Sequence, residues 1–131
     1  MNKIKKYSLL LAIKDEHSIL IFKSAFEDDY GYSIKIIDSF KGVYNEYKQK
    51  NYDIVILTSL GLSASHILEY IVKLKMYDPK IKLMVLSNYD NENFIASLRG
   101  TGIDTIYQLP MEFDALHSGI QSLLHFPSTK K

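Results

Sequence analysis

Short apolar runs alternate along the chain with longer segments in which apolar residues recur every three or four positions. The runs have the length of buried β-strands and are Tyr7–Ile13, Ser33–Ile37, Asp53–Leu57, Ile81–Leu86 and Ile103–Gln108. The segments between and after them have the period of amphipathic helices and cover about 16–28, 40–50, 63–77, 91–99 and 111–125. The third helix has Ser63 or Ser65 as candidate N-cap, and Gly31 is a candidate cap after the first. The pattern therefore predicts five consecutive strand–helix units.

Continuous apolar strands joined by helical crossovers predict a parallel sheet, because such strands must be buried on both faces. Right-handed crossovers then place helices on both sides of the sheet. We expect an α/β fold, a doubly wound five-stranded parallel sheet formed by a single domain over residues 1–125. Residues 126–131 read as a tail or the start of a linker.

Composition narrows the classes of function. The 131 residues are 47% hydrophobic, and sixteen Lys and Arg against fifteen Asp and Glu give a net charge of +1, which argues against a nucleic-acid groove or a membrane-surface patch. The absence of Cys excludes thiol nucleophiles and Cys-ligated zinc. The N-terminal apolar run ends in charged residues without a small-residue cleavage site, so we expect a cytoplasmic protein rather than a secreted one.

Ligands of open α/β sheets bind at the carboxyl ends of the strands. The residues expected there are Lys14-Asp15-Glu16, Thr58-Ser59, Ser87-Asn88 and Leu109-Pro110. No glycine-rich phosphate loop follows the first strand, G-x-S-x-G is absent, and the four histidines lie on separate predicted helices. These patterns disfavour a nucleotide site, a serine hydrolase and a zinc site, and we expect no enzymatic activity.

Four segments in this order carry a resemblance: the acidic cluster after the first strand, YDIVILTSLG, KIKLMVLSNYDNE and LRGTGIDTIYQLP. Over roughly Tyr7 to Leu124 the chain resembles the receiver domain of bacterial response regulators. The resemblance implies a flavodoxin-like sandwich with strand order 2-1-3-4-5. It also implies a pocket in which acids after strands 1 and 3 hold a divalent cation and the strand 3 aspartate accepts a phosphoryl group. A hydroxyl after strand 4 and a Lys after strand 5 bind the phosphoryl oxygens there.

Set against that pattern, the pocket lacks three functional residues. Thr58 stands at the acceptor position, Lys14 replaces the first acid, and Leu109 replaces the phosphate-binding Lys. The residues of this vestigial phosphorylation pocket are Lys14, Asp15, Glu16, Thr58, Ser87 and Leu109, of which only Asp15, helped by Glu16, and Ser87 match. We therefore expect no aspartyl phosphate, weak or absent Mg²⁺ binding and no cofactor. The Lys14 ammonium either fills the cation space beside the acids or extends into solvent at the strand end.

Candidate switch or interface residues follow from the same resemblance and are Ile106, Tyr107, Phe94, Arg99 and His117. Ile106 stands where receivers often carry a switch aromatic residue, and Tyr107 points to the opposite face of the strand. Ten tyrosines, several at helix edges, are typical of protein interfaces, although compositional bias explains them equally well.

Two hypotheses of function remain. The first is a phosphorylation-independent signalling domain that forms a homodimer in an active-like conformation, as the regulatory module of a transcription regulator whose DNA-binding domain lies beyond Lys131. The alternative is a stand-alone adaptor, or a sensor of a small ligand in a pocket made more apolar by Leu109. In both hypotheses the partners are protein or ligand, DNA is contacted only through another domain, and no membrane is involved.

Overall fold

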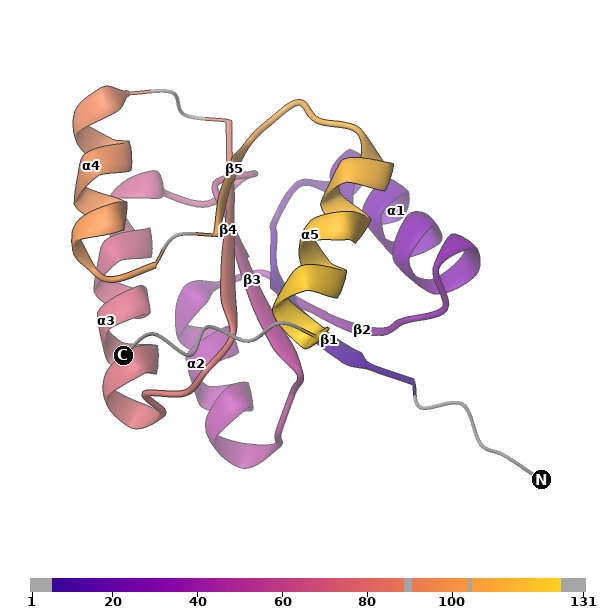
Figure 1. Cartoon of the computed structure of the whole chain (residues 1–131), viewed down its shortest axis with the longest axis horizontal. Coiled ribbons are helices and arrows are strands. Elements are labelled where there is room, and N and C mark those ends of the chain that lie inside the picture. The colour runs from indigo at the N-terminus through magenta and orange to yellow at the C-terminus, as the bar shows by residue number, and fades with distance from the viewer. Residues whose placement is uncertain (1–5, 89–90, 104, 126–131) are drawn as a thin grey trace.

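The computed structural model describes residues 6–88, 91–103 and 105–125. Its centre is a parallel sheet with strand order β2-β1-β3-β4-β5 (Figure 1). The strands are β1 (Ser8–Ala12), β2 (Ser33–Ile37), β3 (Ile54–Thr58), β4 (Leu83–Ser87) and β5 (Ile106–Gln108). This architecture and strand order confirm the predicted fold. The predicted tail, 126–131, lies outside the described residues, as does Asp104 within the predicted fifth strand.

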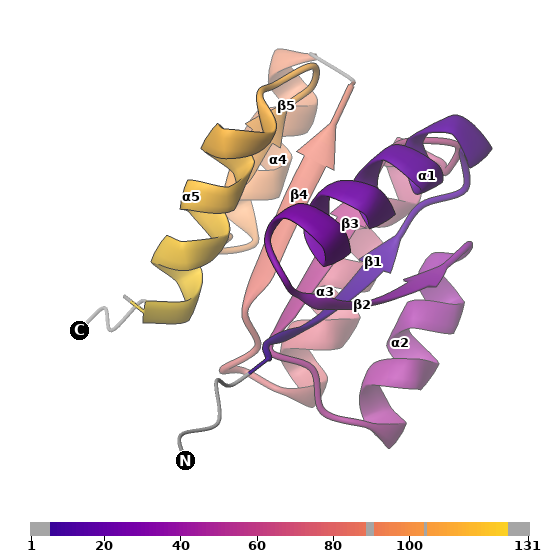
Figure 2. The same cartoon turned by 90° about the vertical axis from the view of Figure 1, so that its right-hand side faces the viewer.

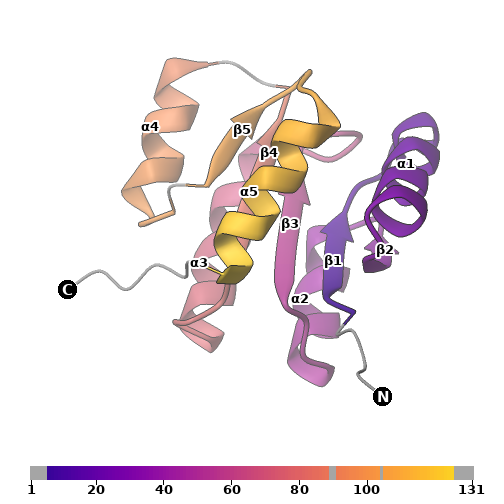
Figure 3. The same ribbon diagram turned by 45° about the vertical axis from the view of Figure 1, so that its right-hand side comes forward.

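Helices cover both faces of the sheet. They are α1 (Glu16–Lys23), α2 (Phe40–Gln49), α3 (Ile67–Tyr77), α4 (Glu92–Gly100) and α5 (Phe113–His125), with a π-helical turn η1 (Ser24–Asp29) after α1 and a 3₁₀ turn η2 (Ala64–His66) before α3. Helices α1 and α5 lie on one face, and α2, α3 and α4 lie on the other (Figures 1 and 2). The edge strand β5 runs between α4 and α5 (Figure 3).

Two hydrophobic layers follow from the alternation of side chains along the strands. Leu9 and Leu11 of β1 point toward α1 and α5, where they meet buried aromatic and aliphatic residues. Leu10 and Ala12 point toward α2, α3 and α4. All five residues of β3 are buried. A strand enclosed on both faces in this way explains the uninterrupted apolar run in the sequence.

Local hydrogen bonds move several element ends from their predicted positions. The fourth strand begins at Leu83 and not at Ile81, because the Ile81 N–H closes a turn onto the Asp78 carbonyl at 3.0 Å. The third helix begins at Ile67, after a 3₁₀ turn, and Ser63 makes no side-chain capping bond. Asn91, in contrast, caps α4 by accepting from the Phe94 N–H at 3.0 Å.

The remaining boundaries also differ in detail. The first helix ends at Lys23 and continues as the π-helical turn, which the apolar period did not predict. Gly31, with φ of 76°, then carries the chain into β2, as the prediction of a glycine cap requires. The last helix begins at Phe113, two residues later than predicted.

Candidate functional site

Thr58 is the last residue of β3 and is fully buried. Its Oγ1 donates to the Ala12 carbonyl of β1 at 2.8 Å and accepts from the Leu60 N–H at 3.1 Å. The hydroxyl therefore uses both its donor and an acceptor position within the protein. Through these two hydrogen bonds Thr58 links the end of β3 to β1 and to the loop that follows β3.

A second hydroxyl joins the loops that follow β3 and β4. Ser59 Oγ accepts from the Asn88 N–H at 2.9 Å and donates to Asn88 Oδ1 at 2.6 Å. Ser87, the last residue of β4, is fully buried, with its Oγ 3.4 Å from Ser59 Oγ. The single Ser59 proton goes to the nearer acceptor, Asn88 Oδ1. The two loops are thus held together by side-chain bonds at the carboxyl edge.

The acidic cluster after β1 serves mainly as a helix cap. Asp15 is the N-cap of α1, and its Oδ2 accepts from the Ser18 hydroxyl at 2.5 Å and from the Ser18 N–H at 3.0 Å. These two bonds, the hydroxyl contributing most, hold the pKa of the Asp15 carboxyl below its usual value. Glu16 is exposed in the first turn of α1, where its negative charge interacts favourably with the helix dipole.

Lys14 is exposed beside this cap. Its backbone N–H donates to the Leu60 carbonyl at 2.9 Å, which ties the end of β1 to the loop after β3. Within the described part of the chain its ammonium forms no ion pair with Asp15 or Glu16. Gly61, the residue after Leu60, lies against the Lys14 backbone. A Cβ at this position would be 2.6 Å from the Lys14 carbonyl oxygen, too close for a side chain.

The end of β5 is apolar. Leu109 is half-buried against the layer of α1 and α5, and its N–H donates to the Ser87 carbonyl at 2.8 Å. The Leu109–Pro110 bond is cis. Ile106 packs toward α4, and Tyr107 packs toward α5 with its ring over Gly119, so the predicted alternation of the two side chains is observed.

The remaining candidate switch residues are not brought together. Phe94 packs into the core between α4 and the sheet and contributes little to the surface. Arg99 is exposed in the last turn of α4. His117 lies on α5, on the opposite face of the sheet, where its ring stacks on Tyr30 with centroids 4.0 Å apart.

Sequence reasoning missed the cluster around His117. Tyr32 Oη lies 3.1 Å from His117 Nδ1, and Tyr30 Oη donates to Asp114 Oδ1 at 2.8 Å. The Asp114 bond is the main reason that the pKa of Tyr30 rises to about 12. These contacts join the start of β2 to α5 across more than eighty residues of sequence. The signals in the sequence are His117, a candidate interface residue, and the pair of tyrosines flanking Gly31.

The divalent cation implied by the resemblance does not fit these residues. One oxygen of the Asp15 carboxylate is already engaged by Ser18, and the Thr58 hydroxyl is neutral and hydrogen-bonded inside the sheet. Mg²⁺ prefers carboxylate ligands in near-octahedral geometry. Across residues 6–88, 91–103 and 105–125, no group of three or more His, Asp or Glu side chains is placed to hold a metal ion.

Comparisons with solved structures bear on the fold. A two-component response regulator from Clostridium difficile superposes with a TM-score of 0.80 at 15% identity, covering 94% of this chain and 100% of that chain. A response regulator from Thermotoga maritima gives 0.78 at 18% identity, covering 92% and 98%. An orphan response regulator of H. pylori gives 0.75 at 18% identity, covering 91% and 97%.

The fold is that of a response-regulator receiver domain. No family model matches the sequence, and no curated relative matches it either. At identities of 18% or less, the structural neighbours of this receiver fold show architecture and not chemistry. Among the helices of the described residues, none is both long and apolar enough to cross a membrane.

Proposed function

We propose that this receiver fold acts as a signalling domain without phosphorylation, through contacts with other proteins. The observation that carries the proposal is the state of Thr58, which resemblance to receivers places at the phospho-acceptor position. An alcohol lacks the negative charge of a carboxylate nucleophile. This one is also fully buried, with its proton committed to the Ala12 carbonyl.

The neighbouring positions support the same proposal. Leu109 supplies no cation for phosphoryl oxygens, and its half-buried side chain belongs to the hydrophobic layer of α1 and α5. The Asp15 carboxylate caps α1, and Ser59 holds the loop after β4 through Asn88. Structural roles within the described chain are therefore filled by Asp15, Thr58, Ser59 and Leu109.

A domain that keeps this fold but cannot be phosphorylated can still bind other proteins through its surface. We propose a cytoplasmic protein whose partner is another protein, with a second copy of the chain as the first candidate. The regulatory half of a transcription regulator is the context that we favour, and DNA would then be contacted by a domain outside this chain. This domain would have no catalytic role.

The proposal is tested by treating the chain with Mg²⁺ and acetyl phosphate and measuring its intact mass, and by recording ¹H–¹⁵N spectra with Mg²⁺ and beryllofluoride. We expect an unchanged mass and no saturable shifts at Lys14, Thr58, Ser87 or Leu109. A hydroxylamine-labile phosphoryl adduct, or saturable shifts at these residues, would refute the proposal.

Two controls show that the conditions are adequate. An ordinary receiver domain that retains its aspartate must be phosphorylated under the same conditions. The triple variant Lys14→Asp, Thr58→Asp, Leu109→Lys restores the residue types that the resemblance assigns to the pocket. If it folds, we expect Mg²⁺-dependent shifts in its spectrum, because two new carboxylates then join Asp15 at the carboxyl edge. If it does not fold, the two measurements on the unaltered chain still decide the question.

A further inference from the structure

Charge is segregated between the two helical layers. Residues 16–29 and 112–125, which contain α1, η1 and α5, hold six acidic residues and one lysine. Residues 40–50 and 67–80, which contain α2 and α3, hold six lysines and three acidic residues. These helices lie on opposite faces of the sheet (Figures 1 and 2). The residue counts therefore give the molecule an acidic side and a basic side. The net charge of +1 does not show this separation, because the acidic and basic residues nearly cancel over the whole chain.

Each side also carries exposed apolar side chains. Among the described residues, the exposed large hydrophobic side chains lie on two helices only, and they are Leu20 and Ile21 on α1, and Val72, Met76 and Tyr77 on α3. Leu20 and Met76 are the most exposed, at 70% and 79%. Single exposed apolar residues are ordinary, but a group of them on one helix marks a candidate contact surface. We call these groups the α1 patch and the α3 patch.

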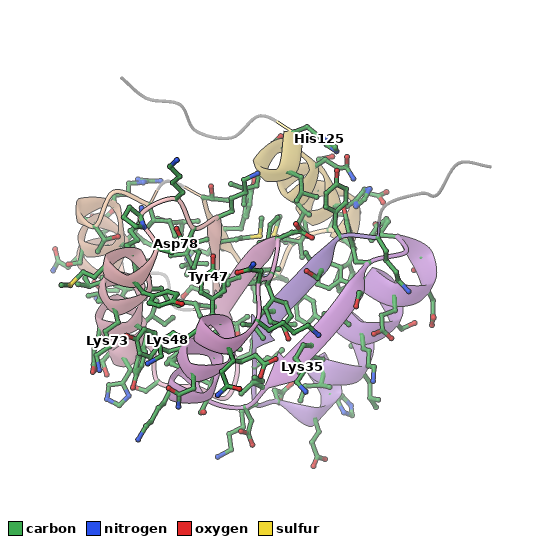
Figure 4. All side chains as sticks on the ribbon, turned by 90° about the horizontal axis from the view of Figure 1, so that it is seen from below. Lys35, Tyr47, Lys48, Lys73, Asp78 and His125 are labelled. Atoms are coloured by element: carbon green, nitrogen blue, oxygen red, sulfur yellow. The ribbon has the colours of Figure 1, made fainter. Side chains whose placement is uncertain are left out.

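Lysines that lie over tyrosine rings border the α3 patch. The Nζ atoms of Lys48 and Lys73 lie 4.3 Å and 5.0 Å from the ring centroids of Tyr44 and Tyr70. Lys73 is also paired with Glu69 at 3.3 Å. Figure 4 shows Lys48 and Lys73 side by side on the α2 and α3 side of the molecule. A cation–π contact at an exposed site is modestly stabilising, which favours this placement of the two ammonium groups at the border of the patch.

The border of the α1 patch has the opposite sign. Glu16 lies one helical turn before Leu20, and Glu27, Asp28 and Asp29 follow in the π-helical turn. All of these acids except Glu27 are exposed, and Lys23 is the only positive charge among them. The chain therefore carries two apolar patches of similar kind with complementary borders.

We infer that the α1 patch of one copy docks on the α3 patch of a second copy. This inference rests on the proposed function only in taking surfaces, and not the pocket, as the working part of the domain. A second copy is favoured over another acidic partner because the complementary patch is present on the same chain. Contacts between identical patches, α1 on α1 or α3 on α3, would bring like charges together.

The geometry of this contact is head-to-tail. Because the two patches lie on opposite faces, a dimer leaves one α1 patch and one α3 patch free, and further copies add in the same way. Each patch contains only two or three large apolar side chains, so the contact is smaller than a stable interface and the association is weak. Charges at its border make it sensitive to salt.

The test uses the whole chain and two patch variants. The α1 variant is Leu20→Lys with Ile21→Lys, and the α3 variant is Val72→Gln with Met76→Gln. All four positions are exposed, so both variants should fold, and far-UV circular dichroism checks this. Ala96→Lys, at an exposed position of α4 outside both patches, is the matched control.

Sedimentation velocity and ¹H–¹⁵N spectra are recorded over a concentration series up to about one millimolar, where weak contacts are populated. We expect the sedimentation coefficient of the unaltered chain to rise without reaching a dimer plateau, with concentration-dependent shifts on α1 and α3 together. Raising NaCl from about 0.05 to about 0.5 M should weaken the association roughly tenfold. The Ala96→Lys control should behave like the unaltered chain.

Mixing the two variants separates this geometry from the others. Each variant alone should remain monomeric, and the mixture should form a one-to-one complex that grows no further, because only one intact pair of patches remains. A chain that stays monomeric throughout would overturn the inference. So would self-association of either variant alone, or shifts confined to α4, β5 and α5. None of these outcomes bears on phosphorylation, so the proposed loss of pocket chemistry stands or falls separately.

Discussion

Replacing Thr58 by Val tests whether the hydrogen bonds of its hydroxyl stabilise the sheet. Valine has nearly the same shape, so the change leaves no cavity but removes the hydroxyl. The Ala12 carbonyl then loses a donor, and the Leu60 N–H loses its acceptor. At about 1 kcal/mol for each bond, the free energy of unfolding should fall by about 2 kcal/mol. For a domain of this size, that corresponds to a melting temperature lower by roughly 8 °C.

Urea denaturation followed by circular dichroism measures this loss directly. The slope of unfolding free energy against urea concentration should not change, because the two chains expose the same surface on unfolding. Thr58→Ser is the matched control. It keeps the hydroxyl and removes one buried methyl group, so it should cost only about 1 kcal/mol. The reasoning is refuted if the free energy of unfolding of the valine variant lies within about 0.5 kcal/mol of that of the unaltered chain. It is also refuted if the valine variant is more stable than the serine variant. In either case the two hydrogen bonds of Thr58 do not stabilise the sheet as assigned.

Three further predictions follow from local contacts. Gly119→Ala should lower stability by about 1–3 kcal/mol, because its Cβ would lie 2.9 Å from the Tyr107 Cζ atom, and the loss should shrink in a Tyr107→Ala background when both are measured by urea denaturation. The pKa of Asp15 is lower in the folded chain than the usual 3.8, so its contribution is present above that pH and lost as pH falls through the folded value. The difference in free energy of unfolding between the unaltered chain and Asp15→Asn should accordingly narrow in acid, whereas a difference that stays constant would contradict the lowered pKa of Asp15. Asp114→Asn should lower the pKa of Tyr30 from about 12 toward 10, as seen in an NMR or ultraviolet titration, and an unchanged pKa would show that the Asp114 bond is not its cause.

The fold was predictable because its information is local and repeated. Each strand is a continuous apolar run and each helix has an apolar period, so five units could be recognised without knowing their contacts. The ends of elements were less predictable. The start of β4 depends on one turn bond between Ile81 and Asp78, and the period of apolar residues does not show such a bond.

The candidate site divides in the same way. The resemblance located Thr58, Ser87 and Leu109 at strand ends, and the structure places all three at the carboxyl edge. It could not indicate that Ser59 binds Asn88, because that contact depends on how two loops 29 residues apart meet in space. The stacking of Tyr30 on His117 was hidden for the same reason.

The position of α5 has a consequence for synthesis of the chain on the ribosome. The layer between the sheet and α2 and α3 uses residues that emerge early, whereas the opposite layer needs Leu116 and Ile120 from the last helix. Until α5 has emerged, Phe26 and the facing side of β1 lack that part of their cover. Because a small domain folds as a unit, its core on the α1 side cannot be completed before the last helix has been synthesised. The contacts of the Tyr32 hydroxyl with α5 likewise form only after that helix has emerged.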